Sequence, residues 1–288
     1  MQGTIIKGIG GFYFVKTGKE VFRCKARGIF KKDNITPMVG DLVELESTEN
    51  GFIVINSIIK RKNEFIRPPV SNVDCFIVVT SAAKPETNFS VVDRFLVMAE
   101  SNDAEAVICI NKVDIAEDAG IRSIESVYEN LYPVVCVSAV SGQGTDRLKK
   151  LMGNGKFALA GPSGAGKSTL LSALQPQANV ETGEISRKTS RGKHTTRHTE
   201  IFELEAGVMV YDTPGFTSFD TPDVEADELQ HMYPEMAELY GKCRYKNCVH
   251  IKEAGCAVAA AATAGQIHES RYGTYREIYN EIISNRKF

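Results

Sequence analysis

Short apolar runs separated by polar turns characterise the first part of the chain. Residues 11–16, 20–25, 41–46 and 51–59 are apolar or alternate between apolar and polar positions, with turn-forming residues between them. Alternation with a period of two, without helical periodicity, is typical of short β-strands. We therefore predict that residues 1–67 form an all-β domain, with about five strands arranged as a small barrel.

The pattern changes after residue 67 to strands that alternate with helices. Apolar strand-like runs occur at 74–79, 105–110, 134–137, 156–160 and 208–211. Helical periodicity occurs between them, at 90–100, 120–131, 145–151 and 169–174. This alternation predicts an α/β domain over residues 68–221, with a mostly parallel sheet covered on both faces and ligands at the carboxyl ends of its strands.

A third pattern begins at residue 222. Residues 223–238 are acidic and predict a helical connector, and 257–264 predict a helix that stops at Gly265. The last segment carries Tyr275, Ile278, Tyr279 and Ile282 at helical spacing, which we interpret as a packing surface. We therefore expect residues 222–288 to form a mainly helical domain.

One stretch of the second domain carries a phosphate-binding pattern, G-x-x-x-x-G-K-S, between a predicted strand and a predicted helix. Glycines let backbone N–H groups converge on phosphate oxygens, and the helix N-terminus adds a positive dipole end. A chance match would lack this flanking strand and helix. The expected phosphate contacts are Gly161, Pro162, Ser163, Gly164, Ala165, Gly166, Lys167, Ser168 and Thr169, with Lys167 on the β- and γ-phosphates and Ser168 on Mg²⁺.

Two other strand ends suggest which base is bound. One strand ends in Asn111-Lys112-Val113-Asp114, and the Asp114 carboxylate matches the N1–H and exocyclic amine donors of guanine, whereas adenine offers it no such pair. Alone, this four-residue match is weak, and a solvated turn is the alternative. A second strand ends in Ser138-Ala139, whose backbone N–H groups are expected to hold guanine O6.

A further strand ends in Asp212-Thr213-Pro214-Gly215. Asp212 is expected to reach Mg²⁺ through water, and the N–H of Gly215 to contact the γ-phosphate. Together these matches, each at the end of a strand, favour a guanine nucleotide.

Near the end of the chain, Cys243, Cys248, His250 and Cys256 lie within fourteen residues of one another. Three thiols and one imidazole fit a closed tetrahedral zinc site, which is structural because it leaves no open coordination position. A redox pair is the alternative, but the C-x-x-C spacing is absent. The remaining cysteines, Cys24, Cys75, Cys109 and Cys136, are single, and we interpret them as small buried hydrophobes in a reducing cytoplasm.

The order of the motifs is unusual, because the base-recognition loops precede the phosphate loop, whereas in ras-like GTPases they follow it. With this order, the chain resembles the circularly permuted, zinc-containing GTPases of small-ribosomal-subunit biogenesis (the RsgA/YjeQ type). The resemblance extends from about residue 68 to the cysteine cluster. It rests on N-K-V-D, S-A-V-S-G-Q-G, G-P-S-G-A-G-K-S, G-K-H-T-T, D-T-P-G-F and C-x₄-C-x-H-x₅-C.

The resemblance implies an OB-fold for the first domain, GTP hydrolysis with Mg²⁺, one structural zinc ion, and the small ribosomal subunit and its RNA as partners. It also implies that a threonine of the basic tract at 187–198 binds Mg²⁺ and the γ-phosphate. We favour Thr196, with Thr195 as the alternative.

The position after Gly215 is Phe216, where ras-like proteins carry a glutamine that orients the attacking water. Because phenylalanine cannot hydrogen-bond a water, the isolated enzyme is expected to be slow. His194, beside the switch threonines, is the candidate catalytic group. The alternative is that His194 is only an exposed histidine in a polar loop.

Charge separates the first domain from the rest. Residues 1–67 carry twelve Lys and Arg against seven Asp and Glu, a net charge of +5, whereas the whole chain is at −2. This favours an RNA-binding barrel, with stacking on Phe12, Tyr13 or Phe14, over a merely solvated face. No apolar run approaches the ~20 residues of a membrane span, and no signal peptide is recognised. We expect a cytoplasmic protein, and we also expect it to be a monomer.

Two other classes of function are disfavoured. A metabolic kinase using GTP needs a substrate pocket with its own acid or base residues, and none is apparent. An RNA-binding protein with a vestigial nucleotide site would not need Lys167, Ser168 and Asp212.

Overall fold

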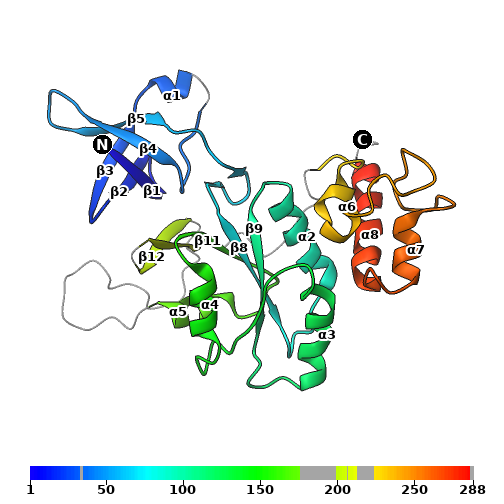
Figure 1. Ribbon diagram of the computed structural model, residues 1–288. Helices are drawn as coiled ribbons and strands as arrows, with labels where there is room; N and C mark the ends of the chain where they lie inside the picture. Colours follow the sequence, from blue (N-terminus) through cyan, green and yellow to red (C-terminus); the bar gives the residue numbers. More distant parts are fainter. Residues whose placement is uncertain (33–34, 176–198, 206, 213–223, 286–288) are drawn as a thin grey trace.

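The structure, a computed structural model, describes residues 1–32, 35–175, 199–205, 207–212 and 224–285. An N-terminal barrel and a C-terminal helical region flank a central sheet (Figure 1). No helix in the described part of the chain is both long and apolar enough to cross a bilayer.

The N-terminal barrel contains five strands, β1 (Gln2–Ile9), β2 (Phe12–Thr17), β3 (Glu20–Ala26), β4 (Leu42–Ser47) and β5 (Ile53–Ile58). They pair in the order β1-β2-β3-β5-β4, and β4 pairs back onto β1, which closes the barrel. The β3–β5 pair is parallel and the others are antiparallel. The predicted five-stranded barrel is confirmed. The apolar runs had not singled out β1 or the short helix α1 (Ile29–Lys32).

Local sequence explains the first hairpin of the barrel. Ile9 pairs with Phe12, so Gly10 and Gly11 form a two-residue turn, and both have positive φ angles (59° and 77°). Positive φ at both positions is what a tight hairpin of this twist requires. Alternate side chains then point inward, and Ile5 and Val15 are fully buried.

The central region contains five parallel strands, β8 (Cys75–Ser81), β9 (Glu105–Asn111), β10 (Val134–Cys136), β11 (Gly155–Ala160) and β13 (Val208–Asp212), in the order β10-β9-β8-β11-β13. The helices are α2 (Phe89–Glu100), α3 (Asp118–Tyr128), α4 (Thr145–Met152) and α5 (Lys167–Leu174). All seven residues of β8 are buried, as expected for a strand covered on both faces. One core cluster includes α2 and α3 and the other α4 and α5, so two helices cover each face.

An additional strand, β12 (Glu200–Glu205), lies antiparallel to β13 and also pairs with β1, where Lys7 is opposite Glu200. Ion pairs of 2.7 Å between Lys7 and Glu200 and between Lys16 and Glu203 accompany this contact. Across the described residues, the barrel and the central region therefore share one sheet of eleven strands.

The segment between the barrel and β8 contains two short strands, β6 (Glu64–Phe65) and β7 (Val70–Ser71), which pair on either side of Pro68 and Pro69. The prolines lie in the turn, so they remove no ladder hydrogen bond.

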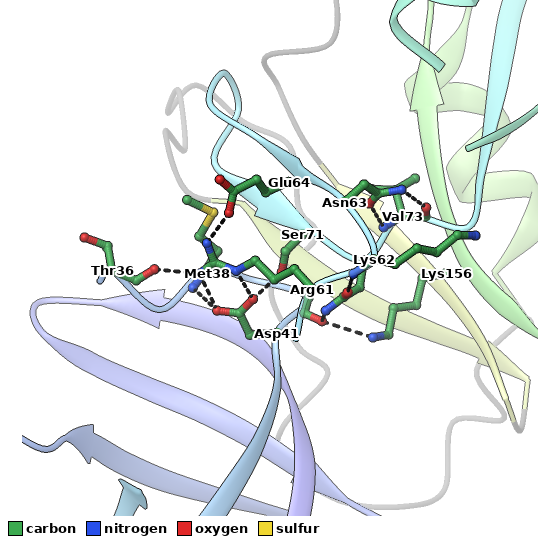
Figure 2. A network of polar contacts seen from close by, with 12 residues as sticks. Thr36, Met38, Asp41, Arg61, Lys62, Asn63, Glu64, Ser71, Val73 and Lys156 are labelled. Atoms are coloured by element: carbon green, nitrogen blue, oxygen red, sulfur yellow. Dashed lines mark hydrogen bonds and ion pairs between the residues drawn. The ribbon is translucent and has the colours of Figure 1, made fainter. Parts of the chain in front are cut away.

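A buried carboxylate fixes this segment to the barrel. Asp41, fully buried, accepts hydrogen bonds from Arg61 (2.7 and 2.9 Å), Ser71 Oγ (2.6 Å) and the backbone N–H of Met38 (2.7 Å) (Figure 2). We call the boundary between the barrel and the central region, where Asp41, Arg61 and Ser71 meet, the seam.

The C-terminal region contains η1 (Leu229–Met232), α6 (Pro234–Ala237), α7 (Ala257–Thr263) and α8 (Glu269–Asn285). The described part of the predicted acidic connector is thus two short helices, because Pro234 begins a new helix at its first position. The tyrosine–isoleucine stripe packs as predicted: Tyr275, Ile278 and Ile282 are buried and Tyr279 is partly buried.

Arg271 connects α8 to the central region. It is 1% exposed, forms 2.7 Å ion pairs with Asp93 of α2 and Glu235 of α6, and lies 4.5 Å from the ring centroid of Tyr233. Asp93 also accepts a hydrogen bond from Tyr128 of α3 (2.9 Å). Buried charges are tolerated only when paired in this way, so Arg271 fixes how the C-terminal region packs.

We predict that Arg271→Ala lowers the free energy of unfolding by about 3–5 kcal/mol, because two carboxylates are left in the interior without their cation. Urea denaturation measures this loss. The control is Arg276→Ala, an exposed position on the same helix, which we expect to change stability by less than about 0.5 kcal/mol. Equal effects of the two substitutions would contradict the structural role of Arg271.

Candidate nucleotide site and metal centre

The sequence-predicted nucleotide residues gather at one edge of the central sheet. Asn111 ends β9, Ser138 and Ala139 follow β10, the phosphate loop follows β11, and Asp212 ends β13. Since these strands are parallel, their carboxyl ends all meet at this edge. The structure thus brings together the described members of the predicted site.

The phosphate loop needs glycine at two positions at least. A Cβ atom at Gly161 would lie 2.0 Å from the carbonyl oxygen of Val79, and one at Gly166 would lie 2.3 Å from Nδ2 of Asn111. Both residues have positive φ, 134° and 93°. Because α5 begins at Lys167, directly after Gly166, its N-terminus faces the loop, which is the arrangement that receives a phosphate.

Lys167 folds back over its own loop. Its Nζ donates hydrogen bonds to the carbonyl oxygens of Gly161 (2.5 Å) and Pro162 (2.9 Å). Burial lowers the pKa of Lys167 to about 8. Phosphate oxygens would stabilise the charged ammonium better than these neutral carbonyls do. Ser163, Ser168 and Thr169 are exposed, with hydroxyls that a ligand can reach.

Asn111, 2% exposed, ties three loops together. Its side chain donates to the carbonyl oxygen of Ala165 (2.9 Å) and accepts from the backbone N–H groups of Lys112 (2.8 Å) and Ala139 (3.1 Å). One amide therefore aligns the phosphate loop with both base loops.

The two base loops differ in whether their predicted guanine-binding groups are free to bind a ligand. Asp114 is exposed and its carboxylate is accessible. The two N–H groups expected to meet guanine O6 are engaged within the protein: Ser138 donates to the carbonyl oxygen of Gln143 (2.9 Å), and Ala139 donates to Asn111. A contact of Ala139 with guanine O6 would require its N–H to be shared with Asn111 or released from it.

Several residues of the predicted site lie outside the described part of the chain: Gly215, and the tract residues His194, Thr195 and Thr196. Phe216 is outside it too.

The loop after β8 also borders the phosphate loop and was not predicted from the sequence. The carbonyl oxygen of Lys84 accepts from Nζ of Lys112 (2.7 Å), and a Cβ at Gly164 would lie 3.2 Å from Pro85. Thr87 ties the loop down by donating to the carbonyl oxygen of Ser81 (2.8 Å). No motif marks this loop, and its only signal is its place at the end of the strand next to β11.

The cysteine cluster converges as predicted. One ligand atom from each of Cys243, Cys248, His250 and Cys256 lies within 4.8 Å of the others. Nδ1 of His250 is 3.3–3.5 Å from the three sulfur atoms, and the sulfurs of Cys243 and Cys256 are 4.0 Å apart. Tetrahedral zinc with ordinary bond lengths separates nitrogen from sulfur by about 3.5 Å and sulfur from sulfur by about 3.8 Å. The donor set therefore fits a zinc ion.

Further contacts orient these ligands. Nε2 of His250 lies 2.9 Å from Oε1 of Gln230, which leaves Nδ1 to face the sulfurs. Backbone N–H groups of Ala257 and Ala259 donate to the sulfurs of Cys243 and Cys256, both at 3.3 Å. Such outer contacts are typical of protein metal sites, and no sequence pattern marks Gln230.

The other four cysteines are free thiols that form no disulfide bond. Cys24, Cys75 and Cys109 are buried as predicted, and Cys136 is half-buried. Burial raises the pKa of Cys75 to about 12 and that of Cys136 to about 11, so both remain protonated and inert.

Comparisons with known proteins agree with this geometry. Residues 2–55 match the RsgA N-terminal domain and residues 58–222 the RsgA GTPase family. Proteins named "Small ribosomal subunit biogenesis GTPase RsgA" are similar to this chain. The one from Alkaliphilus metalliredigens is 42% identical, covering 100% of this chain and 99% of its own. The one from Caldanaerobacter subterraneus is 41% identical, covering 100% and 97%.

Two solved structures have the same fold. YjeQ from Thermotoga maritima is 34% identical, with a TM-score of 0.84 over 98% of each chain. YloQ, titled a circularly permuted GTPase, is 36% identical, with a TM-score of 0.80 over 99% of this chain and 95% of its own. The chain thus belongs to the RsgA GTPase family and is a GTP-hydrolysing enzyme with a circularly permuted nucleotide domain.

Proposed function

We propose that this protein is a GTP-driven switch that binds the small ribosomal subunit, assists its late maturation and hydrolyses GTP faster when bound to it. The names of its relatives support the partner. The observation that carries the switch is the contact of β12 with both β13 of the nucleotide domain and β1 of the barrel. A movement of β13 when the nucleotide changes would therefore be transmitted through β12 to β1 of the barrel.

We assign one function to each of three domains, which comprise residues 1–67, 68–221 and 222–288. The first would bind ribosomal RNA through its basic surface. The second would bind GTP and GDP, and the third would be held together by zinc. The protein would act as a monomer in the cytoplasm, where it meets the ribosomal subunit.

In the nucleotide domain, Asp114 would recognise guanine and the loop 161–169 would hold the phosphates. Ser168 and Thr196 would bind Mg²⁺ directly, and Asp212, at the end of β13, would bind it through water. The ion would neutralise charge on the phosphates. Gly215 would contact the γ-phosphate, and His194 would orient the attacking water.

The C-terminal zinc would be structural. All four donors come from the protein, and His250, Cys248 and Cys256 are at most 6% exposed, so no position remains for a substrate. The cluster closes the loop between α6 and α7, and Cys256 caps α7.

We predict that Asp114→Asn weakens GTP binding roughly 10–100-fold and shifts the preference toward XTP, because xanthine offers an acceptor where guanine offers an amine. Competition binding with the two triphosphates measures this change. Asp118→Asn makes the same chemical change at a nearby exposed position and should leave the preference unchanged. Full retention of GTP affinity in Asp114→Asn would remove the base assignment.

We predict that Cys248→Ser unfolds the C-terminal domain and spares GTP binding, since structural zinc contributes an apparent ~10–16 kcal/mol in small modules. Limited proteolysis with mass spectrometry locates the unfolded segment, and metal analysis counts zinc. Cys136→Ser, outside the cluster, should retain one zinc per chain. Protein purified without chelators and found to be zinc-free would end this assignment.

The proposed function is tested by GTP hydrolysis with and without small ribosomal subunits. We predict slow intrinsic turnover, because Phe216 cannot orient water, and stimulation on the order of 10³–10⁵-fold by the subunit. No stimulation of the parent protein by the subunit would contradict the proposal.

The same assay tests His194. His194→Ala should lose most of the stimulated rate with little change in GTP affinity, as expected for a group that acts only in the transition state. His198→Ala, in the same tract, is the control, and Lys167→Ala should weaken binding as well as turnover. If His194→Ala is stimulated as strongly as the parent, the catalytic group lies elsewhere.

A further inference from the structure

A basic pocket of about 500 Å³ opens at the seam between the barrel and the central region. We call it the seam pocket. Its lining includes four cationic side chains: Lys60, Arg61 and Lys62, which follow the last strand of the barrel, and Lys156 of β11. Figure 2 shows three of them, Arg61, Lys62 and Lys156, at the seam. The nucleotide site lies at the other end of β11 and does not include these residues.

The guanidinium of Arg61 is occupied by intramolecular contacts. It binds the buried carboxylate of Asp41, the carboxylate of Glu64 and the carbonyl oxygen of Thr36. Two acidic partners neutralise it, so Arg61 forms part of the wall and offers little charge to a ligand.

Lys156 differs, because its partner is neutral. Nζ lies 3.0 Å from the carbonyl oxygen of Gly40, and no carboxylate in the described part of the chain forms an ion pair with it. Its backbone N–H donates to Asp74 (2.9 Å), which holds the strand in place beneath the pocket. Burial lowers the pKa of Lys156, and an anion in the pocket would oppose that effect.

The two other lysines lie at the mouth. Lys60 is exposed and makes no hydrogen bond or ion pair with the described residues. Lys62 has only a long, half-exposed contact with Asp74, at 3.4 Å. The four cations of the lining outnumber Asp74 and the two acids paired with Arg61, which leaves a net charge of +1.

The pocket has no means of reading a base. Asn72, the neutral polar side chain of the lining, is hydrogen-bonded within the protein at both ends of its amide: Oδ1 accepts from the N–H of Lys62 (2.8 Å) and Nδ2 donates to the carbonyl oxygen of Gly40 (3.0 Å). Lysines alone neutralise charge without reading sequence, which is how proteins contact a nucleic-acid backbone.

We propose that the seam pocket binds a phosphate of an RNA backbone, held by Lys60, Lys62 and Lys156. The pocket continues the basic surface of residues 1–67, whose net charge is +5, onto the nucleotide domain. This inference rests on the proposed function for the identity of the RNA. It adds a contact point on β11, the strand that leads directly into the phosphate loop, so bound RNA would engage both domains at once.

The test is the salt dependence of binding to purified small ribosomal subunits and to transcribed small-subunit RNA. Log affinity falls linearly with log salt concentration, and each lost phosphate contact makes this slope less steep by roughly 0.7–0.9. We expect Lys156→Gln to lose part of this one contact, and the variant with glutamine at Lys60, Lys62 and Lys156 to lose it completely, a change of roughly 0.7–0.9 in the magnitude of the slope. Lys156→Arg should keep the parent slope, since it keeps the charge.

Lys150→Gln, at an exposed lysine on α4 that does not line the pocket, is the matched control and should keep the parent slope. Urea denaturation of every variant checks folding. We expect Lys156→Gln to be at least as stable as the parent, because it removes a half-buried cation that lacks a carboxylate partner.

The outcomes separate the two proposals. A parent protein that binds neither subunits nor RNA would overturn the proposed function and the seam pocket together. A parent that binds, with unchanged slopes in Lys156→Gln and the triple variant, would overturn only the seam pocket. Binding of free tripolyphosphate that depends on Lys156, without any change in the RNA slope, would make the pocket a small-anion site and contradict the RNA assignment.

Discussion

The buried side-chain amide of Asn111 is the contact on which the nucleotide site depends. Parallel strands bring the loops to one edge, but they do not set the loops against each other. Asn111 does this by bonding Ala165 of the phosphate loop and the N–H groups of Lys112 and Ala139. The close approach of its amide also explains why position 166 must be glycine.

Buried charge then ties this site to the rest of the molecule. Asp41, fully buried, fixes the segment of β6 and β7 to the barrel, and Arg271, 1% exposed, fixes the C-terminal region to α2. A buried ion pair adds little net stability, but breaking it is costly, so each pair favours one packing of its neighbours. We infer that the outer regions respond to the nucleotide domain as rigid bodies, with β12 as the link to the barrel.

Local patterns were sufficient for β2–β5, for the five parallel strands, for the motifs and for the cysteine cluster, because each depends on nearby residues. They failed where partners are distant in sequence. Strand β12 pairs with β1, which lies almost two hundred residues away in the sequence. In the sequence Lys156 is a single lysine within a strand, and only the fold places Lys60 and Lys62 in the same pocket. The hydrogen bonds that occupy the N–H groups of Ser138 and Ala139 are likewise set by loop geometry that no motif records.

The central claim is that the nucleotide controls engagement of the ribosomal subunit. The direct test is the affinity of the full chain for purified small subunits when it is loaded with a non-hydrolysable GTP analogue and when it is loaded with GDP. A switch requires a coupling free energy between the two sites, and we predict roughly 5–150-fold tighter binding in the GTP form. Equal affinities in the two nucleotide states would contradict the account.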